Sequence, residues 1–134
     1  MSDKPFLDSN ILIYAFASGD ARKEKAEALV AAGGIVSVQV LNEFVNVWRH
    51  KQGRDWNELV EALAVLKTLL DPPLPLTMET HELALNVARA HGFRFYDSLI
   101  IAAALQANCP VLYTEDLQHG QTIKHLSIRN PFAG

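Results

Sequence analysis

The spacing of apolar positions along the chain predicts helices that alternate with short strands. Helices are predicted where apolar side chains recur every three or four residues, and strands where short apolar runs are bounded by turn residues. The predicted helices cover residues 21–32, 37–48, 55–70, 80–91 and 98–106. The predicted strands lie at residues 6–8, 35–36, 74–77, 110–114 and 126–128. After the first strand, the pattern predicts a loop or the start of a further helix.

Capping residues at several boundaries support this division. Ser37 precedes an apolar helical pattern and is a preferred N-terminal cap. Asp55 and Glu58 form an acidic variant of the capping box ahead of the next helix. Glycines at Gly33-Gly34 and Gly92 follow two predicted helices and are typical of helix C-termini.

The alternation of strands and helices predicts the fold class. Strands joined through helices form a mostly parallel sheet that is covered on both faces. The expected fold is therefore an α/β protein, a three-layer α/β/α sandwich. The chain has 134 residues, 49% of them apolar, and no internal repeat or low-complexity tract, so we expect a single domain over residues 1–134.

Four acidic residues are expected at one edge of this sheet. Asp8 and Asp116 follow two strands, Asp97 opens a helix, and Glu43 lies early in the helix that follows another strand. The carboxyl ends of parallel strands share one edge with the helix N-termini. Crowded carboxylates repel one another and raise each other's pKa, and a divalent cation removes that penalty. Oxygen ligands without a His or Cys cluster favour Mg²⁺ or Mn²⁺ over zinc.

Each acid also has a structural interpretation. Asp97 can be a helix N-cap, and Asp8 can cap a helix or shape a turn. Asp116 can be a turn residue, with Glu115 as the ligand in its place. Glu43 is the hardest to explain structurally, because its apolar neighbours place it near a face that should be buried. A shared site explains the four acids better than four unrelated roles.

Composition narrows the partners and the location. The formal net charge of −3 argues against a nucleic-acid partner, but setting the four acids aside brings it to +1. The single cysteine, Cys109, permits no internal disulfide and is expected to be buried. Asp3 and Lys4 precede any apolar stretch, unlike a signal peptide, and the longest apolar run, residues 99–105, is too short to span a bilayer. We expect a cytoplasmic protein with no membrane contact.

The motifs around these acids resemble the PIN-domain family and, within it, the VapC-type toxins of toxin–antitoxin pairs. The matching segments are Phe6-Leu7-Asp8-Ser9-Asn10-Ile11-Leu12, Val38-Gln39-Val40-Leu41-Asn42-Glu43-Phe44, Tyr96-Asp97-Ser98-Leu99-Ile100-Ile101-Ala102-Ala103-Ala104, Thr114-Glu115-Asp116-Leu117 and Asn130-Pro131-Phe132. Any one segment is a weak signal. Together they run nearly end to end in the order of the family, which makes the resemblance specific.

The resemblance implies a function and a site. It implies endonucleolytic RNA hydrolysis at a Mg²⁺ or Mn²⁺ ion held by the acidic quartet Asp8, Glu43, Asp97 and Asp116. Asn10 and Thr114 match polar positions that orient a ligand or water. It also implies a homodimer and a cognate antitoxin whose basic segment enters the acidic pocket. Some members carry a further acid beyond the last motif, where this chain has residues 117–119, Leu-Gln-His, so a second metal is not implied.

Substrate contacts must come from cations outside the quartet. The candidates are Arg49, His50, Lys51, Arg54, Arg89, His91 and Arg94. Arg49 and Lys51 also complement the negative end of their helix, which is the preferred interpretation for that pair. Arg94 is the best candidate for a phosphate contact, because it lies close to Asp97 in the sequence. Trp48 and Trp56 are expected to lie in the core or a subunit interface rather than to act as base-stacking platforms.

Two other functions remain open from the residues. Haloacid-dehalogenase-like phosphatases also place an Asp after the first strand, but they need a second Asp where this chain has Asn10, and a later Lys that is not evident. A non-enzymatic α/β module can use an acidic pocket to bind a basic peptide. A trapped aspartyl-phosphate would support the phosphatase, and metal-dependent RNA cleavage would separate the nuclease from the binding module.

Overall fold

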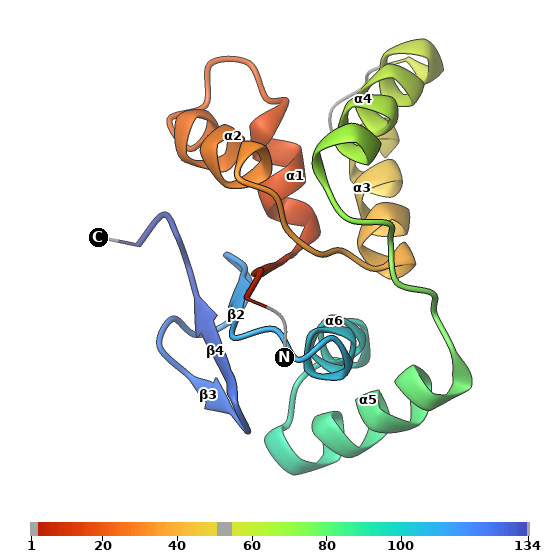
Figure 1. The fold of residues 1–134 in the computed structure, drawn as a ribbon, viewed down its shortest axis with the longest axis vertical. Helices are drawn as coiled ribbons and strands as arrows, with labels where there is room; N and C mark the ends of the chain where they lie inside the picture. Colours follow the sequence, from red (N-terminus) through yellow and green to blue (C-terminus); the bar gives the residue numbers. More distant parts are fainter. Residues whose placement is uncertain (1–2, 51–54, 134) are drawn as a thin grey trace.

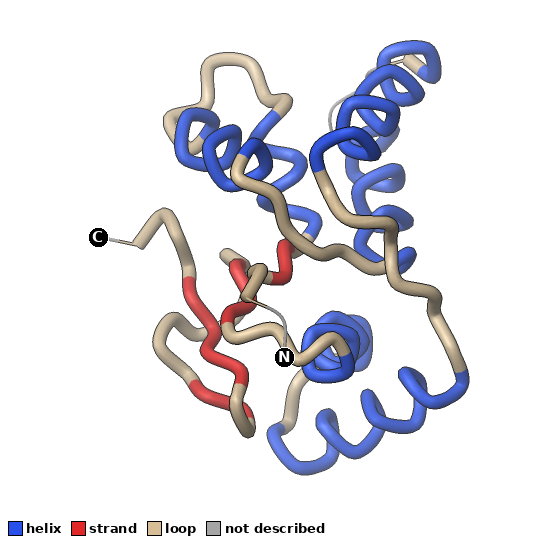
Figure 2. Tube along the Cα trace, viewed as in Figure 1, coloured by secondary structure: helices blue, strands red, loops and turns tan. Residues whose placement is uncertain are grey.

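The computed structural model describes residues 3–50 and 55–133 (Figure 1). This part of the chain contains six helices and four short strands, joined by loops (Figure 2). In chain order the elements are β1 (Phe6–Leu7), α1 (Ser9–Ala15), α2 (Lys23–Ala31), α3 (Val38–His50), α4 (Trp56–Leu69), α5 (Met78–His91), α6 (Phe95–Gln106), β2 (Val111–Tyr113), β3 (Thr122–Ile123) and β4 (Leu126–Arg129).

The sheet is mostly parallel, as expected. Its strand order is β1-β2-β4-β3, with β1 and β4 both parallel to β2 and β3 antiparallel to β4. The strands expected at 35–36 and 74–77 are reduced to single bridges, Phe6 with Ile35 and Ser37 with Leu74. Prolines on both sides of Leu74 supply no N–H group for a longer ladder, and Ser37 already begins the turn into α3.

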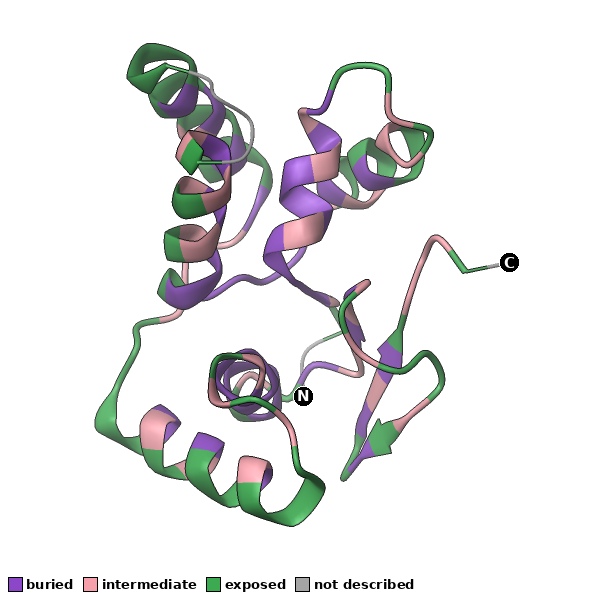
Figure 3. Cartoon of the chain, turned by 180° about the vertical axis from the view of Figure 1, so that it is seen from behind, coloured by how far each residue is buried: buried purple, intermediate pink, exposed green. Residues whose placement is uncertain are grey.

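The helices lie on both sides of the sheet, which confirms the α/β sandwich. In the view of Figure 1, α1 to α4 occupy the upper half, while α5 and α6 pack against each other below. Residues 98–105 of α6 are all buried, so this helix is apolar on every side and lies inside the protein (Figure 3). The core therefore extends from α6 through the short strands to α1 and α3.

Local signals at the helix ends are confirmed. The hydroxyl of Ser37 accepts a hydrogen bond from the Val40 amide at 3.3 Å, and the Asp55 carboxylate accepts one from the Glu58 amide at 2.8 Å. Gly92 ends α5 with a left-handed φ of 76°. Gly34 meets a different need, because a side chain there would lie 3.1 Å from the Pro5 carbonyl oxygen. Such a contact is tighter than most Cβ contacts, so any other residue at this position would require the neighbouring backbone to shift.

Three further predictions concern burial. Cys109 and Trp48 are buried, as expected. Trp56 does not lie in the core, because this side chain begins α4 and is 58% exposed, and its place in a subunit interface stays a prediction. Among the described residues, no helix has the length and apolar character that crossing a membrane requires.

Candidate active site

The register of β1 and β2 places Asp8 beside Thr114. Leu7 pairs with Tyr113, so the next residue of each strand emerges at the same edge of the sheet. The Asp8 amide donates to the Tyr113 carbonyl oxygen at 3.0 Å. Oδ2 of Asp8 accepts a hydrogen bond from the Thr114 hydroxyl at 2.8 Å. Both side chains are buried, so the two motifs are joined away from solvent.

Asp8 also caps α1. Its Oδ1 accepts a hydrogen bond from the Ser9 amide at 2.7 Å. The structural role considered for this residue is therefore present, and the helix begins at Ser9, immediately after the strand. The capping bond uses one carboxylate oxygen and the Thr114 bond uses the other, so both oxygens are fixed in place.

Asn10 ties the first motif to the last. Its amide nitrogen donates to Oδ2 of Asp116 at 3.1 Å and to the Thr114 hydroxyl at 3.4 Å. Its amide oxygen accepts from the Glu115 backbone N–H at 3.2 Å. These bonds fix the segment after β2, so that Asp116 lies at the same edge as Asp8.

Glu43 reaches this edge from α3. Its Oε1 accepts from the Ser9 hydroxyl at 3.4 Å, and its Oε2 accepts from the Gln39 amide at 3.2 Å. Ser9 therefore contacts two of the predicted acids, one through its amide and one through its hydroxyl. Sequence reasoning missed Ser9 and Gln39. The available signals were the position of Ser9 directly after Asp8, and the spacing of four residues between Gln39 and Glu43.

Asp97 is not the N-cap of its helix. The helix α6 begins at Phe95, its N-cap is Arg94, and Asp97 lies within the first turn. The helix extends further toward the N-terminus than predicted, and Phe95 in its first turn packs against the buried residues Ala84, Leu99 and Ala102. Nε of Arg94 donates to Oδ2 of Asp97 at 3.1 Å, and the Arg94 side chain is 81% exposed. Lys51 and Arg54, two other predicted cations, lie outside the described residues.

Glu115 is engaged in a separate ion-pair cluster. Its two carboxylate oxygens accept from Nη1 of Arg22 at 2.9 and 3.1 Å, and one also accepts from the Tyr14 hydroxyl at 3.0 Å. Arg22 in turn pairs with Asp20 at 2.8 Å. The alternative that Glu115 replaces Asp116 in the acidic set is disfavoured, because the charge of Glu115 is already neutralised.

One cavity brings the acids together. It has a volume of about 680 Å³, and its lining includes Glu43, Asp97 and Asp116, together with Ser9 and Arg94. Asp8 lies buried next to this cavity, joined to it through Ser9 and the Asn10–Asp116 contact. The acids expected from four distant segments are thus gathered at one site.

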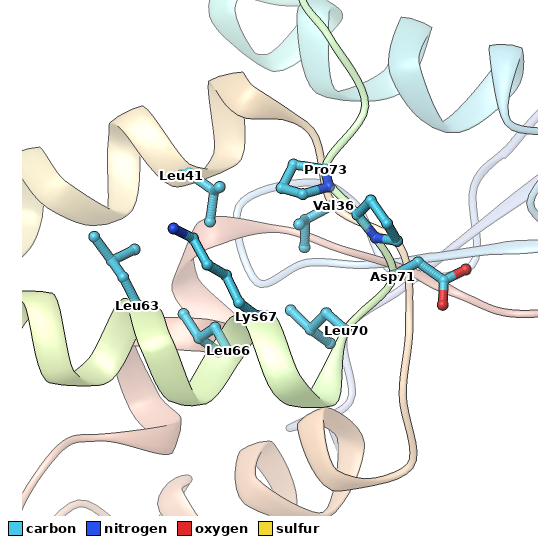
Figure 4. Close-up of a pocket in the computed structure, with 9 residues that line it drawn as sticks. Val36, Leu41, Leu63, Leu66, Lys67, Leu70, Asp71 and Pro73 are labelled. Carbon is cyan, nitrogen blue, oxygen red and sulfur yellow. The ribbon is translucent and has the colours of Figure 1, made fainter.

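The protein also has a smaller, mainly apolar cavity, whose lining differs from that of the active-site cavity. It has a volume of about 280 Å³ and lies between α3, the end of α4 and the proline segment (Figure 4). Its lining is apolar apart from Lys67 and Asp71, and the Asp71 carboxylate points away from it. Without converging polar groups, it offers no means of catalysis.

The acids repel one another. Burial is the main cause that raises the pKa of Asp8 to about 7, and the charges of Glu43 and Asp116 raise it further. Hydrogen bonds from Thr114 and Ser9 act in the opposite direction. The pKa of Glu43 is also raised, first by burial and then by Asp97 and Asp116. A positive charge in the cavity would favour the ionised forms of Asp8 and Glu43 and so lower the pKa of both.

The donor set fits a hydrated divalent cation. Within residues 3–50 and 55–133, no three Asp, Glu, His or Cys side chains stand close enough to form a ready-made metal cage. Mg²⁺ is usually held by one or two carboxylates, with water and substrate phosphates completing its shell. Carboxylates that are at least partly accessible around a roomy cavity, with Asp8 buried beside them, match that mode of binding better than an all-protein site.

Comparison with known families gives the class of protein. A family model for the PIN domain matches residues 6–123, and the chain therefore belongs to the PIN-domain family. This match spans the motifs of Asp8, Glu43, Asp97 and Asp116. No curated protein matches the chain.

Solved structures share the fold. One is *Mycobacterium tuberculosis* VapC20, described as a sarcin–ricin loop cleaving toxin, with 24% identity, a TM-score of 0.70, and coverage of 84% of this chain and 89% of that one. A toxin–antitoxin complex from *Klebsiella pneumoniae* has 17% identity, a TM-score of 0.71, and coverage of 96% and 98%. FitAcB from *Neisseria gonorrhoeae* has 20% identity, a TM-score of 0.71, and the same coverages.

Proposed function

We propose that this protein is a metal-dependent endoribonuclease and the toxin of a toxin–antitoxin pair. The observation that carries the proposal is the gathering of Glu43, Asp97 and Asp116 around one cavity, with Asp8 buried beside it. Membership of the PIN-domain family supports the nuclease activity. The VapC20 structure, which is described as that of a sarcin–ricin loop cleaving toxin, supports RNA as the substrate and the toxin role.

The four acids are the residues proposed to hold the metal, directly or through its water shell, with Mg²⁺ or Mn²⁺ as the cofactor. When bound, such an ion makes a coordinated water more acidic and offsets charge on a phosphorane-like transition state. Thr114, Asn10 and Ser9 hold the carboxylates of Asp8 and Asp116 in fixed positions through the hydrogen bonds described above. This pre-organisation spares the site from reordering when the substrate binds.

Arg94 is the proposed contact for a substrate phosphate. Its guanidinium lines the active-site cavity, and Asp97 is its ion-pair partner. The hydrogen bond to Asp97, followed by the charges of Asp97, Asp116 and Glu43, raises the pKa of Arg94, so it stays cationic. Because the side chain is largely exposed, the pair with Asp97 is weak, and the guanidinium can turn toward an arriving phosphate at little cost.

The proposed partners follow from the same site. A cognate antitoxin with a basic segment would neutralise the acidic cavity and block it, and the *Klebsiella* structure is a toxin–antitoxin complex. We also propose a homodimer that acts in the cytoplasm. Exposed large apolar side chains, such as Met78 and Leu85 on α5, supply surface of the kind that subunit contacts cover.

Cleavage of RNA by charge-neutral variants tests the proposal. Asp8→Asn and Asp97→Asn should abolish Mg²⁺-dependent cleavage of single-stranded RNA, because each removes a ligand charge while keeping the size of the side chain. Circular dichroism should show that both variants remain folded. Glu115→Gln is the matched control and should retain cleavage, since Arg22 and Tyr14 hold that carboxylate. Retained cleavage in Asp8→Asn or Asp97→Asn would refute the site.

The same assay separates the alternatives. A wild-type protein that binds a basic peptide but cuts no RNA in Mg²⁺ or Mn²⁺ would support the non-enzymatic module. A trapped aspartyl-phosphate would support the phosphatase. Membership of the PIN family and the engagement of Asn10 with Asp116 and Thr114 both argue against the phosphatase, which needs a carboxylate at that position.

A further inference from the structure

Two cavities meet along one face of α3. The active-site cavity adjoins a second cavity of about 390 Å³, and Asn42 and Asn46 line both. The two asparagines are four residues apart on α3, so their amide groups lie one helical turn apart on the same face. Both side chains are exposed. A ligand that reacts beside the acids can therefore continue over the two amides into the neighbouring cavity.

The far wall of the second cavity combines aromatic and cationic groups. Arg49 and His50 from the end of α3 line it, as does Trp56 from the start of α4. The Arg49 guanidinium lies 4.4 Å from the centroid of the Trp56 ring, so the two groups are stacked. Trp56 nevertheless remains 58% exposed. The stacked pair presents a flat surface and a positive charge to the cavity.

This combination suits an unpaired nucleotide. RNA-binding proteins hold splayed bases by stacking them on aromatic rings or guanidinium planes, and by hydrogen bonds to the base edges. Carboxamide side chains carry both donors and acceptors, so Asn42 and Asn46 can read such an edge. Glu43 and Arg49 are six residues apart in the sequence, which corresponds to about 9 Å along the helix. The second cavity is therefore close enough to hold a nucleotide adjacent to the one being cut.

We propose that this second cavity is a nucleotide subsite for the RNA strand that is cleaved. An unpaired base next to the scissile phosphodiester stacks on the Trp56–Arg49 pair. Asn42 and Asn46 hydrogen-bond its edge and give the enzyme its base preference. The inference rests on the proposed ribonuclease function and adds to it a specificity site built from α3 and the first residue of α4.

Abasic substitution in the RNA tests the stacking. The probe is a short single-stranded RNA of randomised sequence, and sequencing of the products identifies the preferred cut site. RNAs that contain this site are then synthesised with one base removed at a time. In the wild type, removal of one base beside the cut should lower kcat/KM at least about tenfold. In Trp56→Leu the same removal should cost less than about twofold, because the stacking partner is gone. Trp56→Phe keeps an aromatic ring and should keep the penalty.

Base preference tests the two asparagines. In Asn42→Ala or Asn46→Ala, the four bases at that position should be cut at nearly equal rates, with preferences elsewhere unchanged. Asn86→Ala is the matched control, because Asn86 is an exposed helical asparagine on α5 that lines neither cavity. Its base preference should equal that of the wild type.

A binding measurement distinguishes failure of the nucleotide subsite from failure of the proposed ribonuclease function. Anisotropy of the same labelled RNAs bound to Asp8→Asn, with and without Trp56→Leu, measures the abasic penalty without any cleavage. An equal penalty in both proteins overturns the subsite, even if the wild type is an active nuclease. Light scattering supplies the competing result: if Trp56→Leu dissociates a dimer and leaves the abasic penalty intact, this face joins two copies of the chain, and the subsite is wrong.

Discussion

The hydroxyl of Thr114 donates a 2.8 Å hydrogen bond to Asp8, although 106 residues separate them in the chain. The same hydroxyl oxygen accepts from the Asp116 amide at 3.1 Å and from the Asn10 side chain at 3.4 Å. A hydroxyl has one proton to give, so these two donors direct that proton toward Asp8. Thr114 therefore holds a buried carboxylate and the segment of Asp116 in a single arrangement.

Removing this hydroxyl should damage activity and stability together. Thr114→Val keeps the shape of the side chain but leaves the Asp116 amide without its partner and Asp8 without its donor. We expect a loss of about 1–3 kcal/mol in the free energy of unfolding, measured in urea, and at least about a tenfold loss in RNA cleavage. Thr114→Ser restores the hydroxyl and should restore most of both. A valine variant as active as the serine variant would contradict this role.

Divalent metal should stabilise the fold through the acidic site. An ion that binds only the folded state contributes about 2.7 kcal/mol when its concentration is 100 times its Kd. Mg²⁺ or Mn²⁺ should therefore raise the Tm in thermal unfolding, and zinc should have no special advantage. The double variant Asp8→Asn/Asp116→Asn should lose the rise. If the double variant is stabilised as much as the wild type, the ions bind elsewhere.

Without metal, Asp8 should make stability fall as pH rises. Its pKa is about 7 in the folded protein against an ordinary value of 3.8, so the folded state binds the proton more tightly than the unfolded chain does. The contribution of Asp8 to the free energy of unfolding is fully present below pH 4 and is lost as the pH rises through 7, a change on the order of 4 kcal/mol.

Asp8→Asn isolates this contribution. Urea unfolding in a chelator, at pH values from 4 to 8, should show the variant gaining stability relative to the wild type as pH rises. The variant also weakens the hydrogen bond from Thr114, but this bond is present at every pH. Its loss therefore shifts the free energy of unfolding by a constant amount and does not change how that free energy varies with pH. A stability difference that is flat with pH would show that Asp8 is already ionised throughout.

Metal and a basic inhibitor should compete for one cavity. Arginine can bridge two carboxylates with its planar fork. Asp97 already accepts a single hydrogen bond from Nε of Arg94. The C-terminal peptide of the protein encoded next to this chain's gene should bind less tightly as Mg²⁺ rises in calorimetry. Binding should also weaken in Asp116→Asn, with Glu115→Gln as the control. Affinity indifferent to both changes would place inhibition on another surface.

Sequence reasoning predicted much of the fold because the signals it used are local. The caps at Ser37, Asp55 and Gly92 act within a few residues, and the structure confirms each of them. β3 was missed because Thr122–Ile123 is too short for any alternation to appear, and it depends on pairing with β4. The two single bridges were predicted as strands because apolar composition does not reveal how many backbone hydrogen bonds a neighbouring segment can form.

The acids of the site could be located in the sequence, but their supports could not. Strand ends and helix starts pointed to Asp8, Glu43, Asp97 and Asp116, and the structure gathers them as that pattern requires. The contact of Ser9 with two acids, and the neutralisation of Glu115 by Arg22, depend on side-chain directions across the fold. No sequence spacing encodes such directions, because the partners come from elements far apart in the chain.

The place of β2 in the sheet sets when the active site can first exist during synthesis. β2 inserts between β1 and β4, and Thr114 donates its amide to the Arg129 carbonyl oxygen. Asp8 is synthesised early, at the end of β1. The strand that pairs with β1, β2, gains its other neighbour, β4, only after residue 129 has been synthesised. We therefore expect the proposed nuclease centre to assemble only once β4 is available to pair with β2.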